Sequence, residues 1–487
     1  MNSTDYDDEW YNDPPTEDEI KEIIDSTNLK AVIKTRYGTT RQINREIGGI
    51  QGSSLTGRLF SKQMDTLSEQ FIEKEESFKV NDELSIGCLE WVDDALSFTC
   101  GIKNQNSILN SVDDFARKCK LEWGEAKCQV MQIGRKVKVP TEWSLGEKKI
   151  KNTTSYRYLG DEVTNNNKNK TNLEIRQNKI NATVRQINTT ASSDIMRGVE
   201  ANVILILYEK SILPSLINNC ESWTLTTSEE EQVDKIGINA LKRLFSLPTT
   251  TPNPAIIYSL GQLYVTQEID KKRFMFLHKV LTRNESHWTN KMMLHLKNRN
   301  LGWARNIQNK LTEYKIETDW TKIKTITKKE WKKSVNEAVE RVNMEKLLRN
   351  CISSEPHGEK IKTKTKHIHQ QLTSTTSIKE RRPSKGLLNG TKQRAKTIVL
   401  SRYHMLECGT NFKGTMSQTC RICKTTDNEN HRLNECSIFN ELNHANSLTQ
   451  CNFGDIYNDD NEILNPILSR IDKVWEFRYA NGRMRKL

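Results

Sequence analysis

The stretch Glu90-Trp91-Val92-Asp93-Asp94-Ala95 decides the fold class of the first third of this chain. Its two adjacent aspartates, Asp93 and Asp94, lie between two short runs of β-favouring residues, 84–92 and 95–99. This pattern predicts a hairpin with two carboxylates at its tip. A hairpin turn holds two acids rigidly at one point, which suits the binding of divalent metal ions. The alternative is a solvated acidic turn, because aspartate is common in hairpin loops.

The sequence around this hairpin predicts an α+β unit. Apolar residues recur every three or four positions over 55–71 and over 106–121, so both segments are expected to be amphipathic helices. A strand is predicted over 29–37, ending at Gly38, and a β-rich stretch over 128–159. Strands and helices in this order are typical of the α+β fold class.

Charge and composition restrict the class of protein. The 487 residues carry a formal net charge of +12, with a pI near 9.0 and a mean hydropathy of −0.71, which favours a polyanionic partner. The apolar run 203–207 is too short to span a bilayer, so we expect no membrane partner. Eleven cysteines without a signal-peptide pattern indicate an intracellular protein of the nucleus or cytoplasm.

The flanking segments differ in texture. Residues 1–27 are acidic and polar, so a disordered head is expected. After the β-rich stretch the sequence becomes helical and basic, and helices over 195–213 and 229–247 are predicted to be ended by Pro214 and Pro248.

A basic, tryptophan-containing segment follows at 320–348, and it is expected to be helical. It is compatible with tracking a nucleic-acid backbone while Trp320 and Trp331 stack on bases. It is equally compatible with an amphipathic helix that buries its tryptophans and exposes its lysines. Residues 351–399 contain few large apolar side chains, so a basic linker is expected there, before a C-terminal region at 400–487.

The C-terminal region contains a second constellation of reactive side chains, spaced Cys420-x2-Cys423-x7-His431-x4-Cys436. Three thiolates and an imidazole are the donor set that tetrahedral Zn²⁺ prefers, and four protein ligands leave no open position, so a structural zinc knuckle is predicted. The alternative is three unrelated buried cysteines near a histidine. Arg421, Lys424 and Arg432 beside the ligands are candidates for phosphate contacts.

The ordered set of motifs resembles the palm of a reverse transcriptase from the LINE-type (non-LTR) retrotransposons. The motifs are Gly38-Thr39-Thr40, Gln51-Gly52-Ser53-Ser54-Leu55, Leu59-Phe60, Met64-Asp65, Val92-Asp93-Asp94, Lys127 and Tyr158-Leu159-Gly160. The resemblance continues through Ile212-Leu213-Pro214, Glu221-Ser222-Trp223-Thr224-Leu225, Tyr258-Ser259-Leu260-Gly261 and Arg273-Phe274-Met275-Phe276-Leu277-His278, and it resumes at the Cys/His cluster.

This resemblance implies a domain order and roles for individual residues. It implies a partial palm at 28–165, a helical thumb and connection at 166–350, and a terminal zinc knuckle. Asp93, with Asp94 as the weaker candidate, would bind Mg²⁺ or Mn²⁺ for two-metal nucleotidyl transfer. Gln51 and Gly52 would contact nucleotide, and Lys127 would approach the triphosphate. Lys127 is equally compatible with an ordinary surface lysine. The partners would be an RNA template and a DNA primer.

The family's first catalytic aspartate precedes the Gln-Gly loop on a strand, and the 50 residues before Gln51 contain no such pattern. We therefore expect an RNA-directed DNA polymerase whose palm begins between its first and second catalytic motifs and is not active alone. The alternative is a catalytically dead remnant that binds nucleic acid through its thumb surface and zinc knuckle.

Overall fold

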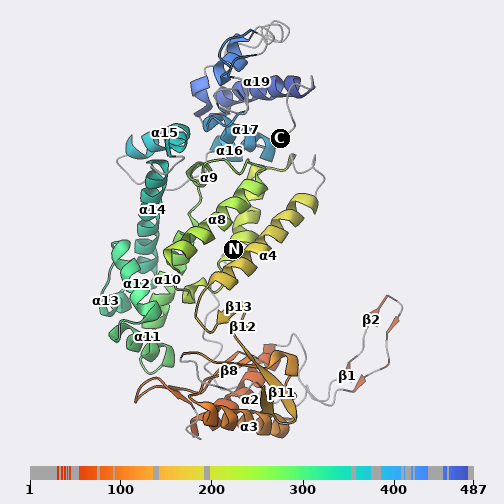
Figure 1. The fold of residues 1–487 in the computed structure, drawn as a ribbon, viewed down its shortest axis with the longest axis vertical. Helices are drawn as coiled ribbons and strands as arrows, with labels where there is room; N and C mark the ends of the chain where they lie inside the picture. The colour runs from red at the N-terminus through yellow and green to blue at the C-terminus, as the bar shows by residue number, and fades with distance from the viewer. Residues whose placement is uncertain are drawn as a thin grey trace. The chain divides into compact units, whose positions relative to one another are not determined.

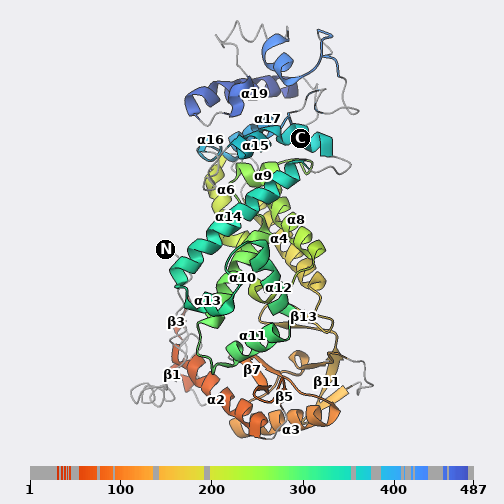
Figure 2. The same cartoon turned by 90° about the vertical axis from the view of Figure 1, so that its left-hand side faces the viewer.

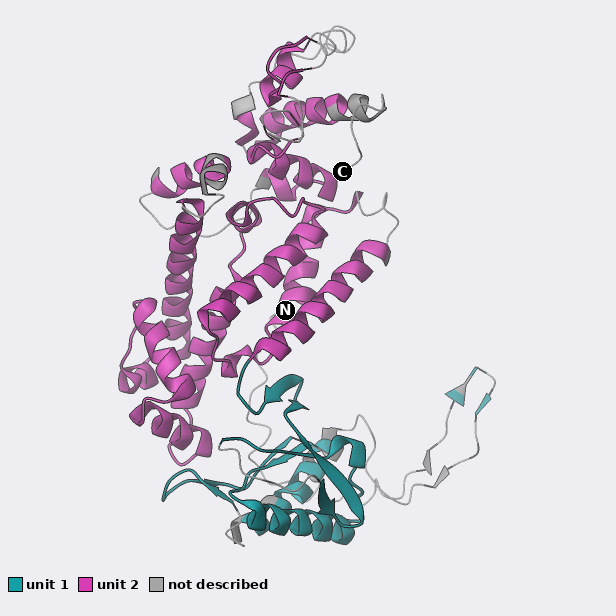
Figure 3. Cartoon of the chain, viewed as in Figure 1, with its two compact units in different colours: residues 1–168 teal, residues 169–487 magenta. Residues whose placement is uncertain are grey.

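The computed structural model describes residues 54–73, 77–91, 94–134, 142–190, 198–352, 358–374, 385–406, 418–420, 423–436, 453–457 and 460–480, with a few positions between 30 and 44 and at 408 and 411. The chain is mixed α+β, as predicted, and divides into two compact units, residues 1–168 and 169–487 (Figures 1 and 3). The division lies close to the boundary that was expected after residue 165.

The first unit combines two long helices with short strands. In chain order its elements are β1 (Lys30–Ala31), β2 (Lys34–Thr35), β3 (Gly38–Thr39), β4 (Ile43–Asn44), α2 (Ser54–Glu73), β5 (Phe78–Lys79), β6 (Ser85–Ile86), β7 (Cys88–Trp91), β8 (Asp94–Ser97), α3 (Ile102–Cys119), η2 (Glu125–Lys127), β9 (Gln129–Met131), β10 (Glu142–Leu145), β11 (Lys148–Thr153), β12 (Ser155–Tyr158) and β13 (Asp161–Thr164). The helices predicted over 55–71 and 106–121 are α2 and α3.

Helix α3 organises this unit because two of its faces are buried. One face packs on α2, and the other packs on a three-stranded sheet in which β11 pairs antiparallel with β10 and parallel with β9. The first contact buries Met64, Leu67, Phe71, Ile108 and Phe115, and the second buries Leu109, Trp143, Leu145 and Ile150. The apolar residues of α3 therefore belong to two separate hydrophobic contacts, one with α2 and one with the sheet.

The acidic hairpin predicted from the sequence is formed by β7 and β8. Their antiparallel register pairs Trp91 with Asp94 and Cys88 with Ser97. Two residues, Val92 and Asp93, therefore connect the strands, and they lie outside the described residues. Asp94 is the first residue of β8, where its side chain is exposed.

The single strand predicted over 29–37 is wrong. Two short antiparallel pairs are present instead, β1 with β4 and β2 with β3. The register of the second pair joins Thr35 to Gly38, so the chain reverses within the predicted strand. Gly38 has a φ of +132°, which a residue with a Cβ rarely adopts, and this explains why the reversal ends there. The acidic head at 1–27 lies outside the described residues.

The second unit is helical in the part that the structure describes. Its elements are α4 (Lys170–Thr190), α6 (Ala201–Leu207), η3 (Tyr208–Ile212), α7 (Leu213–Leu216), η4 (Cys220–Ser222), α8 (Thr227–Leu244), α9 (Asn253–Ser259), α10 (Val265–Leu281), α11 (Trp288–Asn298), α12 (Gly302–Glu313), α13 (Trp320–Thr325), α14 (Lys328–Ile352), α15 (Gly358–Ser374), α16 (Lys385–Leu388), α17 (Lys392–Arg402), η5 (His431–Glu435), η6 (Phe453–Tyr457) and α19 (Asn461–Ala480). None of the described helices has the length and apolar character needed to cross a membrane.

The two prolines expected to end helices behave differently. Helix α8 ends at Leu244, before Pro248, as predicted. At Pro214 the prediction is wrong, because α6 continues through the π turn η3 into α7 and reaches Leu216. Pro214 follows directly on the π turn η3, where the regular bonding pattern of the α-helix is interrupted, so a residue without a backbone N–H is tolerated there.

The basic stretch predicted as one helix over 320–348 forms two helices, α13 and α14. The break lies at Thr327, whose hydroxyl accepts a hydrogen bond from the Glu330 backbone N–H at 3.3 Å, while the Glu330 carboxylate accepts one from the Thr327 N–H at 3.2 Å. This reciprocal cap starts α14. Trp320 and Trp331 are 1% and 0% exposed, so the amphipathic interpretation is the correct one and neither indole is available for stacking.

Within the segment expected as a linker, 351–399, the described residues form the end of α14, α15, α16 and most of α17. Although this segment has few large apolar side chains, those it has are buried, among them Ile368, Leu387 and Ile398. They belong to one hydrophobic cluster that extends from Leu173 in α4 to Val474 in α19. A second cluster fills the space between α10, α11, α12, α13 and α14 (Figure 2).

Gly237 of α8 provides a test of this packing. A Cβ built at this position would lie 2.4 Å from Cγ2 of Val265 in α10 and 3.1 Å from the Tyr208 hydroxyl. Gly237→Ala should therefore lower the free energy of unfolding by about 1–3 kcal/mol through overpacking, as measured by urea denaturation.

Gly57 of α2 is the matched control, since a Cβ there would meet nothing within 4 Å. Gly57→Ala should leave stability unchanged or raise it by up to about 1 kcal/mol, because alanine is the better helix former. Equal destabilisation by both variants would contradict the close approach of α8 and α10.

Candidate metal centre

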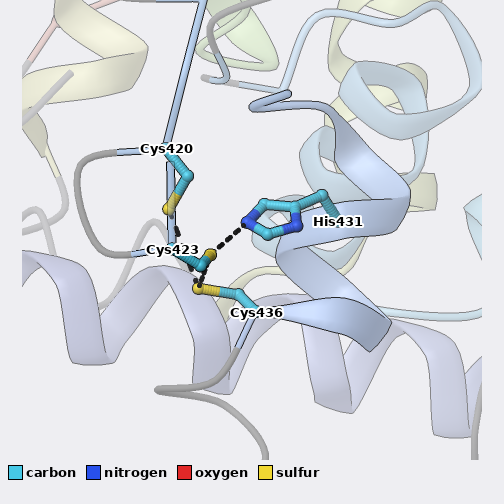
Figure 4. Close-up of side chains that lie close together, drawn as sticks. All are labelled: Cys420, Cys423, His431 and Cys436. Carbon is cyan, nitrogen blue, oxygen red and sulfur yellow. Dashed lines mark hydrogen bonds between the residues drawn. The ribbon is translucent and has the colours of Figure 1, made fainter. Parts of the chain in front are cut away.

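The four side chains predicted as zinc ligands converge in the C-terminal part of the second unit (Figure 4). One donor atom from each of Cys420, Cys423, His431 and Cys436 lies within 4.8 Å of all the others. Three of these side chains are buried and Cys423 is partly exposed. The spacing in the sequence therefore corresponds to one site in space.

The distances within this cluster suit a tetrahedral metal ion. Sγ of Cys436 lies 3.8 Å from Sγ of Cys420 and 3.7 Å from Sγ of Cys423. Zn–S bonds of about 2.3 Å place two tetrahedral sulfurs about 3.8 Å apart. A disulfide would need about 2.05 Å, so these cysteines are not paired with each other. The residues fit zinc, and four ligands would leave no position open for substrate.

Two short turns bring the ligands together. In the first, the Cys420 backbone N–H donates to the Thr425 carbonyl at 2.8 Å, and the Lys424 N–H donates to the Cys420 carbonyl at 3.0 Å. Lys424 has a φ of +58°, which closes the turn. In the second, η5 begins at His431, and the Cys436 N–H donates back to the His431 carbonyl at 2.8 Å.

The imidazole of His431 is oriented by two side chains that the sequence interpretation missed. Its Nε2 lies 3.1 Å from Sγ of Cys423, so Nε2 is the ligand atom. Its Nδ1 lies 3.1 Å from the Thr425 hydroxyl and 3.6 Å from the Glu435 carboxylate. Partners of this kind fix the orientation of a metal-binding histidine. Glu435 lies four residues after the histidine on one helical turn, which is the signal that was available in the sequence.

Arg432 was predicted as a phosphate contact, and its position contradicts this. The guanidinium is 1% exposed and forms a two-pronged ion pair with Asp427, with Nε 2.6 Å from Oδ1 and Nη2 2.5 Å from Oδ2. Because this ion pair is buried, Arg432 stabilises the fold around the metal centre and is not available to a phosphate. Of the other two candidates, Lys424 is exposed and Arg421 lies outside the described residues.

A second polar contact joins the metal centre to α17. The buried carboxylate of Glu429 accepts a hydrogen bond from the Asn411 side chain at 2.9 Å and lies 2.7 Å from Nδ1 of His404. The hydrogen bond to Glu429 raises the pKa of His404 above its ordinary value, although burial opposes this. The segment that holds His431 is therefore tied to the chain just after α17.

Three of the residues predicted at a polymerase-like site, Gln51, Gly52 and Asp93, lie outside the described residues. The other two, Asp94 and Lys127, are exposed. The described part of the chain contains no carboxylate cluster of three or more around Asp94, since the Cys/His group is the one such set of ligands found there.

Strand β12 brings Asp94 and Lys127 into one neighbourhood. The Tyr156 hydroxyl donates to the Lys127 carbonyl at 2.9 Å. Partial burial, and then the charge of Asp94, raise the pKa of Tyr156. The next motif residues, Leu159 and Gly160, form the two-residue turn between β12 and β13, and both have positive φ angles of 48° and 91°. The glycine is therefore explained by turn geometry.

A comparison of this sequence with protein-family models and with the curated proteins finds no match.

The metal content of the protein and of two cysteine variants tests the Cys/His site. The purified protein should contain one zinc per chain by atomic emission, and Co²⁺ in its place should give the visible spectrum of a tetrahedral thiolate complex. Cys436→Ser should lose the metal, whereas Cys100→Ser, which removes an exposed cysteine outside the site, should keep it. Zinc at a thousandfold excess over its dissociation constant should stabilise the folded protein by about 4 kcal/mol. Equal zinc content in both variants would contradict the site.

The ion pair between Arg432 and Asp427 provides a second test. Arg432→Met should lower the free energy of unfolding of the zinc-saturated protein by about 3–5 kcal/mol, because it leaves a buried carboxylate unpaired. The double variant Arg432→Met/Asp427→Leu removes both charges and should recover most of this loss. If the single variant unfolds like the wild type, the pair does not support the site.

Proposed function

We propose that this chain is a reverse-transcriptase-domain protein of LINE-type retrotransposon origin, acting on RNA and DNA inside the cell, and that it does not polymerise alone. The observation that carries the proposal is the hairpin of β7 and β8. Its register pairs Trp91 with Asp94, so Asp94 is the first residue of β8, close enough to Tyr156 of β12 for its charge to act on that hydroxyl. This is the position in which a two-metal polymerase needs its acids.

Roles for individual residues follow from this proposal. Asp93 and Asp94 would hold Mg²⁺ or Mn²⁺, which would activate the primer 3′-hydroxyl and neutralise charge on pyrophosphate. Gln51 and Gly52 would contact the nucleotide. Lys127 would approach its triphosphate, and the exposure of this lysine and its link to Tyr156 are compatible with that role.

A second candidate function is a catalytically inactive protein that binds nucleic acid. The observation favouring it is that, among the described residues, Asp94 belongs to no group of three or more side chains that could hold a metal ion. Burial of Arg432 removes one of the phosphate contacts that the zinc knuckle would have supplied. This candidate must therefore rely on other cationic side chains.

Primer extension tests the first candidate. Zinc-loaded protein is incubated with a labelled oligo(dT) primer on poly(A) and either Mg²⁺ or Mn²⁺, comparing the wild type with Asp93→Ala and with the control Asp82→Ala, an exposed acid in another turn. We expect the wild type to bind the template–primer but not to extend it, because two-metal catalysis needs more carboxylates than this hairpin supplies.

Extension that is lost in Asp93→Ala and retained in Asp82→Ala would contradict the claim that the chain is inactive alone. Absence of any binding at low salt, where phosphate contacts are strongest, would contradict both candidates.

A further inference from the structure

A dense cluster of lysines lies on α13 and the first turns of α14. Residues 319–333 contain six lysines and two carboxylates, and all six lysines are exposed: Lys322, Lys324, Lys328, Lys329, Lys332 and Lys333. The two acids are engaged by the backbone, since Asp319 accepts from the Thr321 N–H at 2.9 Å and Glu330 caps the start of α14. Six lysines against two carboxylates make the surface positive, and both carboxylates serve as helix caps. We call these six residues the lysine cluster.

The lysine cluster rests on a rigid base. Trp320 and Trp331 are buried beneath it, and the Trp331 indole N–H donates to the Phe274 carbonyl at 3.0 Å. The ring of His278 stacks on Trp331 and bonds the Ile326 carbonyl between the two helices at 2.8 Å. These contacts hold α13 and α14 at a set angle, so their lysines present a fixed arrangement of charge.

Two side-chain contacts join α13 to α11 and to the residues just before it. Nζ of Lys297, near the end of α11, lies 4.9 Å from the ring centre of Trp320 at the start of α13. Nζ of Lys324, near the end of α13, lies 2.5 Å from the Glu285 carboxylate, three residues before α11. The residues that lead into the first turn of α11 therefore lie next to the end of α13, and Figure 2 shows α11 and α13 in the same part of the second unit.

That first turn presents an exposed indole beside the lysine cluster. Trp288 is 44% exposed, in contrast to the buried Trp320 and Trp331. Its neighbour His287 accepts a hydrogen bond from the Thr289 N–H at 3.2 Å and stacks on the indole with ring centres 6.1 Å apart, which orients it. Lys291, one turn further along α11, is exposed as well.

We propose that Trp288 and the lysine cluster form a binding surface for single-stranded RNA or DNA. The lysines contact successive phosphates, and the indole stacks on an unpaired base. A duplex keeps its base faces covered, so Trp288 favours the single strand. This inference rests on the proposed action on nucleic acid and specifies where and in which form the strand binds.

The same residue types can also bind an anionic membrane, and the surface argues against that. A helix that enters the lipid interface needs a continuous apolar face. Among the described residues, α13 and the first turns of α14 expose no large apolar side chain, since Trp320, Ile323 and Trp331 are buried, and the exposed Trp288 adds one indole rather than a continuous apolar face. The lysines are therefore placed for a polyanion in solution.

Fluorescence anisotropy with the full zinc-loaded chain tests the proposal. The probes are a labelled 20-nucleotide oligo(U) RNA, an oligo(dT) of the same length, and a duplex of that length. Trp288→Ala should weaken single-strand binding about tenfold and leave duplex binding unchanged, and Trp288→Phe should restore most of the loss. The matched control is Phe78→Ala, which removes an aromatic side chain that is 43% exposed in the first unit and should change nothing.

A second variant tests the contribution of charge, with Lys322, Lys329, Lys332 and Lys333 all changed to Gln. This variant should reduce the slope of log affinity against log salt by about 3 for a single strand. The control changes four exposed lysines elsewhere, Lys62, Lys151, Lys179 and Lys235, and should keep the wild-type slope. Thermal unfolding should show that all variants remain folded, because every changed side chain is exposed.

The outcomes separate this inference from the proposed function. If the wild type binds and both Trp288→Ala and the lysine variant bind equally well, the inference is wrong and nucleic-acid binding occurs at another surface. If the wild type binds no oligonucleotide at low salt, the proposed function itself is wrong. If the wild type binds vesicles of phosphatidylserine and phosphatidylcholine through these residues in preference to oligonucleotides, the surface is a membrane contact and the inference is overturned.

Discussion

The hydrophobic cluster that extends from Leu173 to Val474 is the interaction on which the second unit depends. It joins helices whose positions in the sequence differ by about three hundred residues, and it includes Cys420 and Cys436 of the metal centre. Burial of apolar surface on this scale is the main favourable term in folding. The metal centre is thus part of the main core, so metal binding and packing of the C-terminal helices stabilise the same folded state.

Polar groups inside this unit determine how the helices meet. The buried Asp234 of α8 accepts a hydrogen bond from the Thr266 N–H at 2.9 Å, which caps α10, and pairs with Lys346 of α14 at 2.6 Å. Asp270 of α10 pairs with Arg273 at 3.2 Å and accepts from the Tyr314 hydroxyl at 2.9 Å. An unpaired buried charge is costly, so the helices are held in the arrangement in which each carboxylate keeps its partners. These contacts orient α14 and hence the lysines at its start.

The features on which the proposed function and the proposed binding surface rest lie in different units of the chain. The first unit holds the acidic hairpin with Asp94, and the second holds the metal centre and the lysine cluster. With four protein ligands, the metal centre suits a structural role. In the proposed binding surface, contact with nucleic acid would depend on exposed charge at α13 and α14 and on Trp288, because Arg432 beside the metal centre is buried.

The sequence by itself determined the local features. Apolar spacing predicted α2 and α3, a proline signal predicted the end of α8, two β-favouring runs predicted the hairpin, and Cys/His spacing predicted the ligand set. These patterns are readable because neighbouring residues generate them. Only the tertiary structure decided which charged and aromatic side chains are buried. Arg432 and Lys322 are both cationic, and Trp331 and Trp288 are both indoles, yet one of each pair is buried and the other is exposed. Trp331 is buried against residues remote in sequence, such as Phe274, and Arg432 is buried in an ion pair with Asp427. A local sequence pattern does not predict which of these side chains the tertiary structure covers.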